Sequence, residues 1–158
     1  ATPTKSAPIT KLNSSPTAAV LVLGFGPVGR ALAVRLAALG AQVTVAARRP
    51  VQRAMAEELG LRAVPLTDLA AAAAAFDTVV NTIPAPVLTA AVLAALPKGC
   101  LIVDLASTPG GTDFAAARRL GHTALHALSL PTVWAPETAG EALARTVQAI
   151  LQEREGTI

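Results

Sequence analysis

Three glycines fall within six positions, directly after an apolar run and directly before a stretch with helical spacing. The segment VLVLGFGPVGRALA, residues 20–33, carries Gly24, Gly26 and Gly29 in the pattern G-x-G-x-x-G. Such a corner lets main-chain N–H groups reach a diphosphate without a Cβ in the way, and the start of the following helix favours the anion. The pattern therefore predicts a dinucleotide site, with a purely structural packing corner as the alternative.

Strand-like and helix-like segments alternate along the rest of the chain. The strands are apolar throughout instead of alternating with polar residues, as in a parallel sheet covered on both faces. Right-handed crossovers then predict an α/β, Rossmann-like, doubly wound sheet in three αβα layers with strand order 3-2-1-4-5-6. The expected strands are 18–23, 42–46, 62–66, 77–83, 100–106 and 122–128, and the expected helices are 27–39, 50–59, 68–75, 86–96, 113–120 and 137–153.

Composition limits the class of protein. The chain has 158 residues and is 53% hydrophobic, enough for one folded domain, which we place at 18–158. Residues 1–17 carry three prolines and many hydroxyl groups and are expected to be a flexible linker or tail. No apolar run reaches the roughly 18 residues of a membrane span, so no membrane partner is expected.

The content of cysteines, aromatics and charges narrows the partners. The single cysteine, Cys100, fits a reduced, cytoplasmic compartment, and the lack of a Cys or His cluster predicts no metal site. The net charge is +3, but the basic residues are scattered and there are no tyrosines to stack on bases. Nucleic acid is therefore not expected as a ligand.

The end of the second expected strand bears on the choice of cofactor. It reads VAARR, with no acid where NAD sites usually carry one for the ribose 2′-hydroxyl. Guanidinium groups fork onto phosphate oxygens, so the pair favours NADP, whereas either arginine alone is also compatible with a solvated basic turn. The predicted cofactor contacts of the two turns are Gly24, Phe25, Gly26, Pro27, Val28, Gly29, Ala47, Arg48 and Arg49.

Ligands of such sheets lie beyond the carboxyl ends of the strands. After the fourth strand we expect Asn81, Thr82, Ile83 and Pro84 to line the nicotinamide half, with a plain turn as the alternative for their side chains. After the fifth strand, Asp104 and Ala106 are further expected cofactor contacts.

The loop after the fifth strand, STPGGT, is long and rich in glycine. Its backbone is suited to form a nest for a carboxylate, although a merely structural loop competes with this interpretation. Asp113 is expected to cap the next helix. The candidate substrate contacts are Ser107, Pro109, Gly110, Gly111 and Thr138.

Asp104 and His126 are the candidates for proton transfer, with no assignment between them. A single histidine in a strand is also compatible with a hydrogen-bonded core residue. Without tyrosine there is no Tyr-x-x-x-Lys pair, so hydride chemistry is left to the cofactor. A lone nucleotide domain also lacks one wall of a substrate cleft, which another domain or chain is expected to supply.

Five stretches together resemble the C-terminal NADP-binding domain found in the dipicolinate synthase family, in its A subunit. They are VLGFGPVGRALA, VAARR, VVNTIPAPVL, LIVDLASTPGGTDF and LPTVWAPETAG, within residues 18–151. The resemblance implies an NADP-dependent oxidation of a dihydrodipicolinate-type precursor to dipicolinate during sporulation. It also implies a small anionic dicarboxylate substrate, a second subunit similar to the B subunit of dipicolinate synthase, and an N-terminal domain that this sequence does not include; a homo-oligomer stays open.

Two other functions are compatible with the pattern. One is a regulatory nucleotide-sensing module without catalysis, like the cytoplasmic domains of potassium channels, which usually keep an acid after the second strand. The other is a scaffold for a partner subunit. A preference of the chain for NADPH over NADH would favour an NADP-dependent oxidoreductase over the regulatory nucleotide-sensing module.

Overall fold

The computed structural model of the protein describes residues 18–126. The expected tail at 1–17, the end of the sixth strand, the last helix at 137–153 and Thr138 lie outside the described residues.

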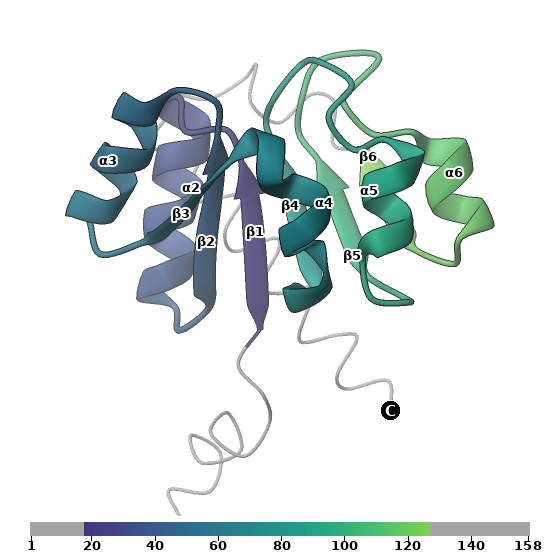
Figure 1. Ribbon diagram of the computed structural model, residues 1–158, viewed down its shortest axis with the longest axis horizontal. Coiled ribbons are helices and arrows are strands. Elements are labelled where there is room, and N and C mark those ends of the chain that lie inside the picture. The colour runs from purple at the N-terminus through teal and green to yellow at the C-terminus, as the bar shows by residue number, and fades with distance from the viewer. Residues whose placement is uncertain (1–17, 127–158) are drawn as a thin grey trace, which may run out of the picture.

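A six-stranded parallel sheet forms the centre of the domain, between two layers of helices (Figure 1). Its strand order is β3-β2-β1-β4-β5-β6, so the predicted order and fold class are confirmed. The strands are β1 (Ala19–Leu23), β2 (Gln42–Ala47), β3 (Arg62–Pro65), β4 (Thr78–Asn81), β5 (Leu101–Asp104) and β6 (Thr123–His126).

The strand register places the carboxyl ends of the strands side by side. Leu23 at the end of β1 pairs with Ala46 of β2 on one side and with Asn81 of β4 on the other. Asn81 in turn pairs with Asp104 of β5, and Asp104 with His126 of β6. The loops that follow these residues therefore start from a single edge of the sheet.

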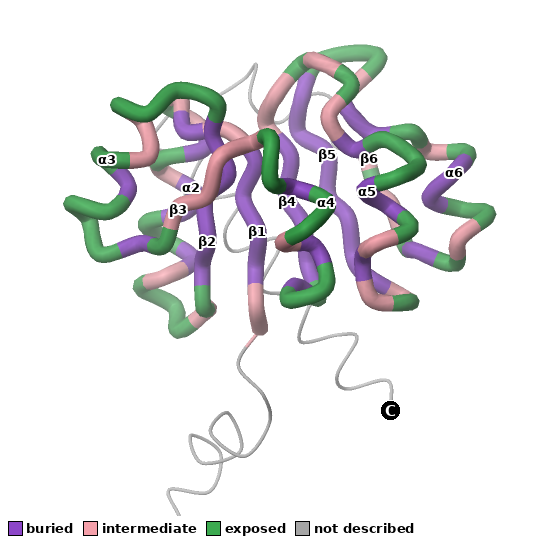
Figure 2. Tube along the Cα trace, in the orientation of Figure 1, coloured by how far each residue is buried: buried purple, intermediate pink, exposed green. Residues whose placement is uncertain are grey.

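Helices cover both faces of the sheet, which explains why the strands are apolar throughout. In β1, Val20 and Val22 pack in one core cluster with Leu32 of α2, whereas Leu21 and Leu23 belong to the cluster on the opposite face. Figure 2 shows the central strands buried along their length. The helical segments are α2 (Pro27–Ala38), α3 (Pro50–Glu58), α4 (Leu69–Ala72), α5 (Ala90–Ala95) and α6 (Phe114–Arg119), with 3₁₀ turns η1 (Leu66–Asp68) and η2 (Ala73–Ala75).

The alanine-rich segment is less regular than its composition predicts. Instead of one helix over 68–75, the structure has the single turn α4 between the 3₁₀ turns η1 and η2. None of the three carries a side-chain N-cap hydrogen bond, and tighter 3₁₀ turns are a common way to satisfy main-chain groups at such ends. The propensity of alanine thus predicts a helix here, but not its length.

The helix expected at 86–96 begins four residues later, at Ala90. Val87 and Leu88 donate their N–H groups to the carbonyl oxygen of Gly111, at 3.1 and 2.9 Å, and so pair with a loop far along the chain. Thr89 then caps α5, because its hydroxyl accepts from the N–H of Val92 at 3.4 Å. A tertiary contact therefore overrides the local signal of Pro86 as a helix start.

Among residues 18–126, no helix combines the length and the apolar composition that crossing a bilayer requires.

His122 is a buried polar link between two elements at the end of the sheet opposite to these loops. The N–H of Cys100 donates to its Nδ1 at 3.2 Å, so Nε2 carries the proton and donates to the carbonyl oxygen of Leu93 at 2.7 Å. The residue thus ties the C-terminal half of α5 to the segment that leads into β5.

We predict that His122→Ala lowers the free energy of unfolding by about 2 kcal/mol, because the buried carbonyl of Leu93 loses its donor and a cavity is left. Urea denaturation measures this change. The neighbouring exposed Thr123→Ala serves as control and should cost less than about 0.5 kcal/mol. Equal losses in the two variants would contradict the assigned link.

Candidate functional site

The glycine corner joins β1 to α2 with little space inside it. Gly24 has a φ of 97°, a left-handed conformation that glycine adopts without strain, and its N–H donates to the carbonyl oxygen of Ala46 at 2.9 Å. A Cβ on Gly29 would overlap the carbonyl group of Gly24. These two glycines therefore make the turn and the close approach of helix to strand that the motif predicts.

The third glycine faces open space. A Cβ on Gly26 would have no atom within 4 Å. Among the described residues, the N–H groups of Gly26, Val28 and Gly29 donate to no protein atom, whereas the N–H of Arg30 already bonds to Gly26. Free donors at the start of a 12-residue helix are suited to a diphosphate, so this corner fits the dinucleotide that its sequence predicts.

A cavity of about 400 Å³ lies in front of the corner. The first, second and fourth strands each contribute the loop at their carboxyl end. Its lining residues are Gly24, Phe25, Gly26, Pro27, Val28, Gly29, Ala47, Arg48, Arg49, Gln52, Leu66, Thr82, Ile83 and Pro84. The structure thus brings together most of the cofactor contacts expected from the sequence, and adds Gln52 and Leu66.

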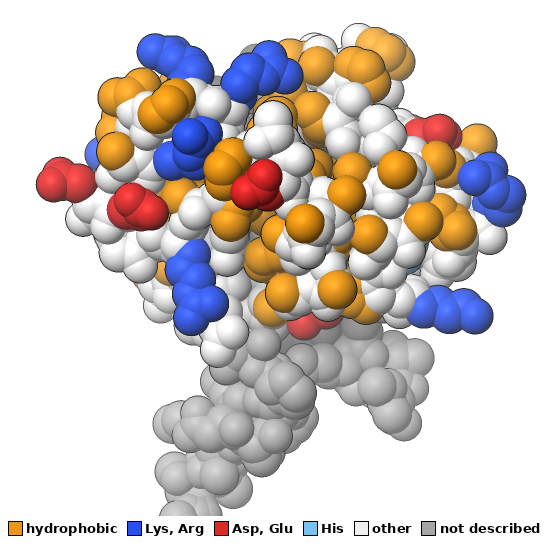
Figure 3. Space-filling model, in the orientation of Figure 1, with side chains coloured by type: hydrophobic (Ala, Val, Ile, Leu, Met, Phe, Trp, Pro, Cys, Tyr) orange, Lys and Arg blue, Asp and Glu red, His pale blue; other side chains and the backbone are white. Residues whose placement is uncertain are grey.

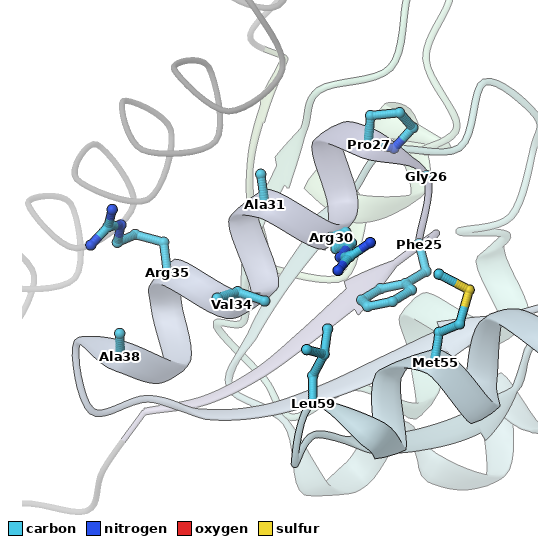
Figure 4. A pocket seen from close by; sticks show the side chains of 10 residues that line it. All are labelled: Phe25, Gly26, Pro27, Arg30, Ala31, Val34, Arg35, Ala38, Met55 and Leu59. Carbon is cyan, nitrogen blue, oxygen red and sulfur yellow. The ribbon is translucent and has the colours of Figure 1, made fainter.

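Phe25 lines this cavity and also a second one, into which its side chain points (Figure 4). The ring is 4% exposed and lies between α2 and α3, near Met55 and Leu59 (Figure 4). The second cavity is a groove of about 980 Å³ between these helices. It is the larger of the two, but the turns that follow β2 and β4 do not line it, so we place the candidate site in the smaller cavity.

Thr82 lies beneath the glycine corner. Its hydroxyl and its N–H both donate to the carbonyl oxygen of Leu23, at 2.7 and 3.0 Å. The hydroxyl oxygen fills the space that a Cβ on Gly24 would need. The sequence predicts Thr82 beside the nicotinamide half, and the structure shows its hydroxyl joining β4 to β1, a role that sequence reasoning missed.

The turn between β2 and α3 is basic. Arg48 and Arg49 are exposed, and Arg49 is the N-cap residue of α3. Arg53 extends back from α3, and its Nη1 donates to the carbonyl oxygens of Ala47 and Arg48, at 2.8 and 2.9 Å. Basic side chains gather along this upper edge above α3 (Figure 3). Sequence reasoning did not single out Arg53, because its contacts are to main-chain oxygens that any residue would supply.

Asp104 ends β5 as a fully buried carboxylate. Oδ1 accepts from Asn81 Nδ2 at 3.2 Å and from the N–H of Ala106 at 3.0 Å. Oδ2 accepts from the N–H of Gly111 at 2.9 Å and from the hydroxyl of Thr112 at 2.5 Å. Four donors and no exposed surface make this side chain an organiser of its loop, not the accessible group that proton transfer or cofactor contact requires.

Asn81 is engaged in the same way. Its Nδ2 also donates to the carbonyl oxygen of Ile83 at 3.0 Å, and its Oδ1 accepts from the N–H of Ile83 at 3.0 Å. The side chain is fully buried. Asn81 therefore shapes the loop expected beside the nicotinamide from within. In that loop Ile83 is half-buried and Pro84 is exposed, and both line the cavity.

The loops after β4 and β5 form one connected unit. The carbonyl oxygen of Gly111 accepts from Val87 and Leu88, and the N–H of Asp113 donates to Leu88 at 3.0 Å. A Cβ on Gly111 would come too close to the carbonyl oxygens of Ile83 and Ala85. The absence of a side chain at Gly111 therefore serves packing between the two loops, and not contact with a substrate.

The tip of the loop after β5 is exposed. Ser107, Thr108 and Pro109 are exposed, and in the described structure the N–H groups of Ser107 and Thr108 have no protein acceptor. Gly110 has a φ of 82°, and its N–H donates to the carbonyl oxygen of Ser107 at 2.7 Å. The peptide bond between Thr108 and Pro109 is cis. Free donors at the tip are those that a carboxylate nest would use.

His126 closes the opposite side of this loop. Its Nε2 lies 2.8 Å from the carbonyl oxygen of Ala106, and its ring centroid lies 5.3 Å from that of Phe114. Gly110 lies between His126 and Asp104, since a Cβ there would be 3.1 Å from both His126 Nε2 and Asp104 Oδ2. His126 is half-buried, so of the two candidates for proton transfer only this one keeps some exposure.

Predicted helix caps are also found in this region. Asp113 caps α6, since its Oδ1 accepts from the N–H of Ala116 at 3.0 Å.

Among residues 18–126, no group of three or more His, Cys, Asp or Glu side chains is arranged to hold a metal ion.

Comparison with known proteins agrees with this geometry. Residues 6–111 match the family described as D-isomer specific 2-hydroxyacid dehydrogenase, NAD binding domain. The chain is 42% identical over 134 residues to the A subunit of dipicolinate synthase from Bacillus subtilis (strain 168), covering 85% of this chain and 45% of that protein. The crystal structure of the A subunit of dipicolinate synthase from Bacillus halodurans is similar with a TM-score of 0.72 and 40% identity, over 90% of this chain and 50% of that one.

A third similar structure is shikimate 5-dehydrogenase from Thermus thermophilus in complex with NADP(H) and shikimate. It is 30% identical, with a TM-score of 0.56, over 90% of this chain and 53% of that one. This chain therefore spans about half the length of the relatives it matches. It belongs to the family of NAD-binding domains of D-isomer-specific 2-hydroxyacid dehydrogenases, a nicotinamide-binding oxidoreductase family, and it is similar to the A subunit of dipicolinate synthase over most of its length.

Proposed function

We propose that the chain is the NADP-binding domain of an oxidoreductase that resembles the A subunit of dipicolinate synthase. The observation that carries this proposal is the pairing of free main-chain donors at Gly26, Val28 and Gly29 with the basic turn at Arg48 and Arg49, around one cavity. The donors suit the diphosphate, and the arginines suit a further phosphate on the adenosine ribose.

The choice of NADP over NAD rests on charge. No acid stands at the end of β2, and the first turn of α3 contains no acidic residue. An NAD site usually places a carboxylate there, which would repel a 2′-phosphate. The similar shikimate 5-dehydrogenase structure contains NADP(H), which supports the same choice.

When bound, NADP would supply the hydride acceptor for oxidation of a dihydrodipicolinate-type dicarboxylate, which loses a hydride and a proton to become aromatic dipicolinate. In this scheme the glycine corner binds the diphosphate, and the Ile83–Pro84 segment lies beside the nicotinamide half. The free N–H groups of Ser107 and Thr108 orient a substrate carboxylate. Asp104 contributes by holding this loop in place.

The rest of the substrate cleft would come from outside this chain. The chain covers half or less of the two dipicolinate synthase relatives, and their designation as one lettered subunit of an enzyme supports a partner subunit. We propose a partner similar to the B subunit of dipicolinate synthase, and a role in a sporulating bacterium's cytoplasm, in line with the single buried cysteine. In this proposal the proton of the substrate is taken by a group of the cleft that this chain forms together with its partner.

We predict that Gly26→Ala abolishes most NADPH binding and lowers the free energy of unfolding by no more than about 1 kcal/mol, because Gly26 is the N-cap residue of α2. Gly26 has a φ of −77° and a ψ of −168°, which alanine also adopts, and its Cβ would enter open space where the diphosphate is expected. The Kd for NADPH, from calorimetric titration, should rise about 30-fold or more, as for the loss of a charge-assisted hydrogen bond. The matched variant Gly29→Ala should lower stability more, because its Cβ meets backbone. Unchanged NADPH binding in Gly26→Ala would contradict the proposed site.

We predict that the chain prefers NADPH to NADH by about 100-fold and that Arg48→Ala combined with Arg49→Ala reduces this ratio below about fivefold. The reason is that only NADPH carries the phosphate that these guanidinium groups would contact. Titration of wild type and variant with both cofactors measures the ratio. Equal affinities in the wild-type chain would show that the domain is not selective for NADP.

We predict that Asp104→Asn loosens the loop after β5 and leaves the glycine corner intact. The amide of asparagine has one acceptor atom in place of two, so its NH₂ would face either the donors of Asn81 and Ala106 or those of Gly111 and Thr112, and hydrogen exchange at the Ala106 or the Gly111 amide should become about tenfold faster or more. The Kd for NADPH should change by less than about threefold. Asp113→Asn is the control, because asparagine caps a helix as well as aspartate does. Unchanged exchange at both the Ala106 and the Gly111 amides would rule out the organising role of Asp104.

A further inference from the structure

Arg53 lies next to the proposed adenosine-phosphate site without lining its cavity. Ala47, Arg48 and Arg49 all line that cavity. Arg53 sits behind them, in α3, and its Nη1 reaches the carbonyl oxygens of Ala47 and Arg48. It thus contacts the backbone from which the two exposed arginines extend.

These two hydrogen bonds change the electrostatics of the turn. Carbonyl oxygens carry partial negative charge, and two of them facing a phosphate would oppose its binding. Arg53 engages both oxygens and adds a full positive charge at the same place. No ion pair offsets that charge, since within residues 18–126 none of Arg48, Arg49 and Arg53 forms one with an acid.

The same contacts restrict the backbone of the turn. The N–H groups of Gln52 and Arg53 donate to the carbonyl oxygen of Arg49 at 3.1 and 3.2 Å, which closes the first turn of α3. The main chain of Arg48 and Arg49 is therefore held from both sides, by the helix and by the Arg53 side chain. Fixed backbone lowers the entropy that two long side chains lose when they bind an anion.

We infer that Arg53 is a specificity-determining positioning residue, which makes the β2–α3 turn selective for a phosphate on the adenosine ribose by masking two carbonyl oxygens and holding Arg48 and Arg49 over the cavity. This inference rests on the proposed function. A purely structural role in α3 would affect ligands with and without that phosphate equally. A role in specificity affects mainly the phosphorylated ligand.

Short ligands test the adenosine end separately from the diphosphate corner. The probes are 2′,5′-ADP, which carries the extra phosphate, and 5′-AMP, which lacks it; both are titrated into the 158-residue chain at fixed ionic strength. Arg53→Met removes the positive charge and the hydrogen-bond donors but keeps an apolar side chain. Arg53→Lys keeps the positive charge and provides an NH₃⁺ group as the donor in place of the guanidinium group. Arg62→Met, at the exposed start of β3, is the control for loss of one positive charge.

We predict that Arg53→Met raises the Kd for 2′,5′-ADP about tenfold and the Kd for 5′-AMP less than twofold. Arg53→Lys should recover most of the affinity for 2′,5′-ADP. Arg62→Met should change the Kd for either probe by no more than about twofold. The NADPH to NADH ratio should fall in parallel. Thermal melting of each variant shows whether folding is preserved.

The other outcomes separate the two proposals. If Arg53→Met weakens both probes equally, or neither, while the double variant of Arg48 and Arg49 loses the preference, the inference about Arg53 is wrong and the NADP site stands. If the wild-type chain binds 2′,5′-ADP and 5′-AMP equally, the NADP assignment fails, and the role of Arg53 fails with it.

Discussion

The contact between the end of β1 and the start of α2 constrains every other feature of the candidate site. The carbonyl of Gly24 lies where a side chain on Gly29 would be, and the hydroxyl of Thr82 lies where a side chain on Gly24 would be. The end of β1, the start of α2 and the distant end of β4 therefore meet without room for one additional carbon atom. Because interiors tolerate such overlap poorly, the direction in which α2 leaves the sheet is fixed, and so is the direction of its free N–H groups.

Asp104, at the end of β5, constrains the loops at the same edge of the sheet. Its carboxylate joins Asn81 at the end of β4 to Gly111 and Thr112 in the loop after β5. Burying a carboxylate is costly unless donors surround it, and here four donors do so. The negative charge is thus tied to one arrangement of the loop, which makes Asp104 a device for conformational specificity more than a source of stability.

Features that recur along the chain can be predicted from the sequence, whereas features that depend on a single contact with a distant residue cannot. The strand order follows from the alternation of strand-like and helix-like segments and is confirmed. Local features also end the helices, since Gly40, Gly60 and Gly121 stand after α2, α3 and α6 in a left-handed conformation. The start of α5 is not local, because residues 87 and 88 pair with Gly111. The same holds for the burial of Asp104 and Asn81. The sequence alone does not distinguish a polar residue at the end of a strand that faces the cavity from one that faces the loop behind it.

The polar groups that line the cavity and remain exposed are largely main-chain and arginine groups. Asp104 and Asn81 are fully buried, and Thr82 donates its hydroxyl proton to Leu23. The free donors are N–H groups at the glycine corner and at the loop tip, joined by the guanidinium groups of the β2–α3 turn. Such groups bind and orient anions, but they do not exchange protons near neutral pH. Within residues 18–126 the groups that line the cavity are therefore suited to binding and orienting an anion.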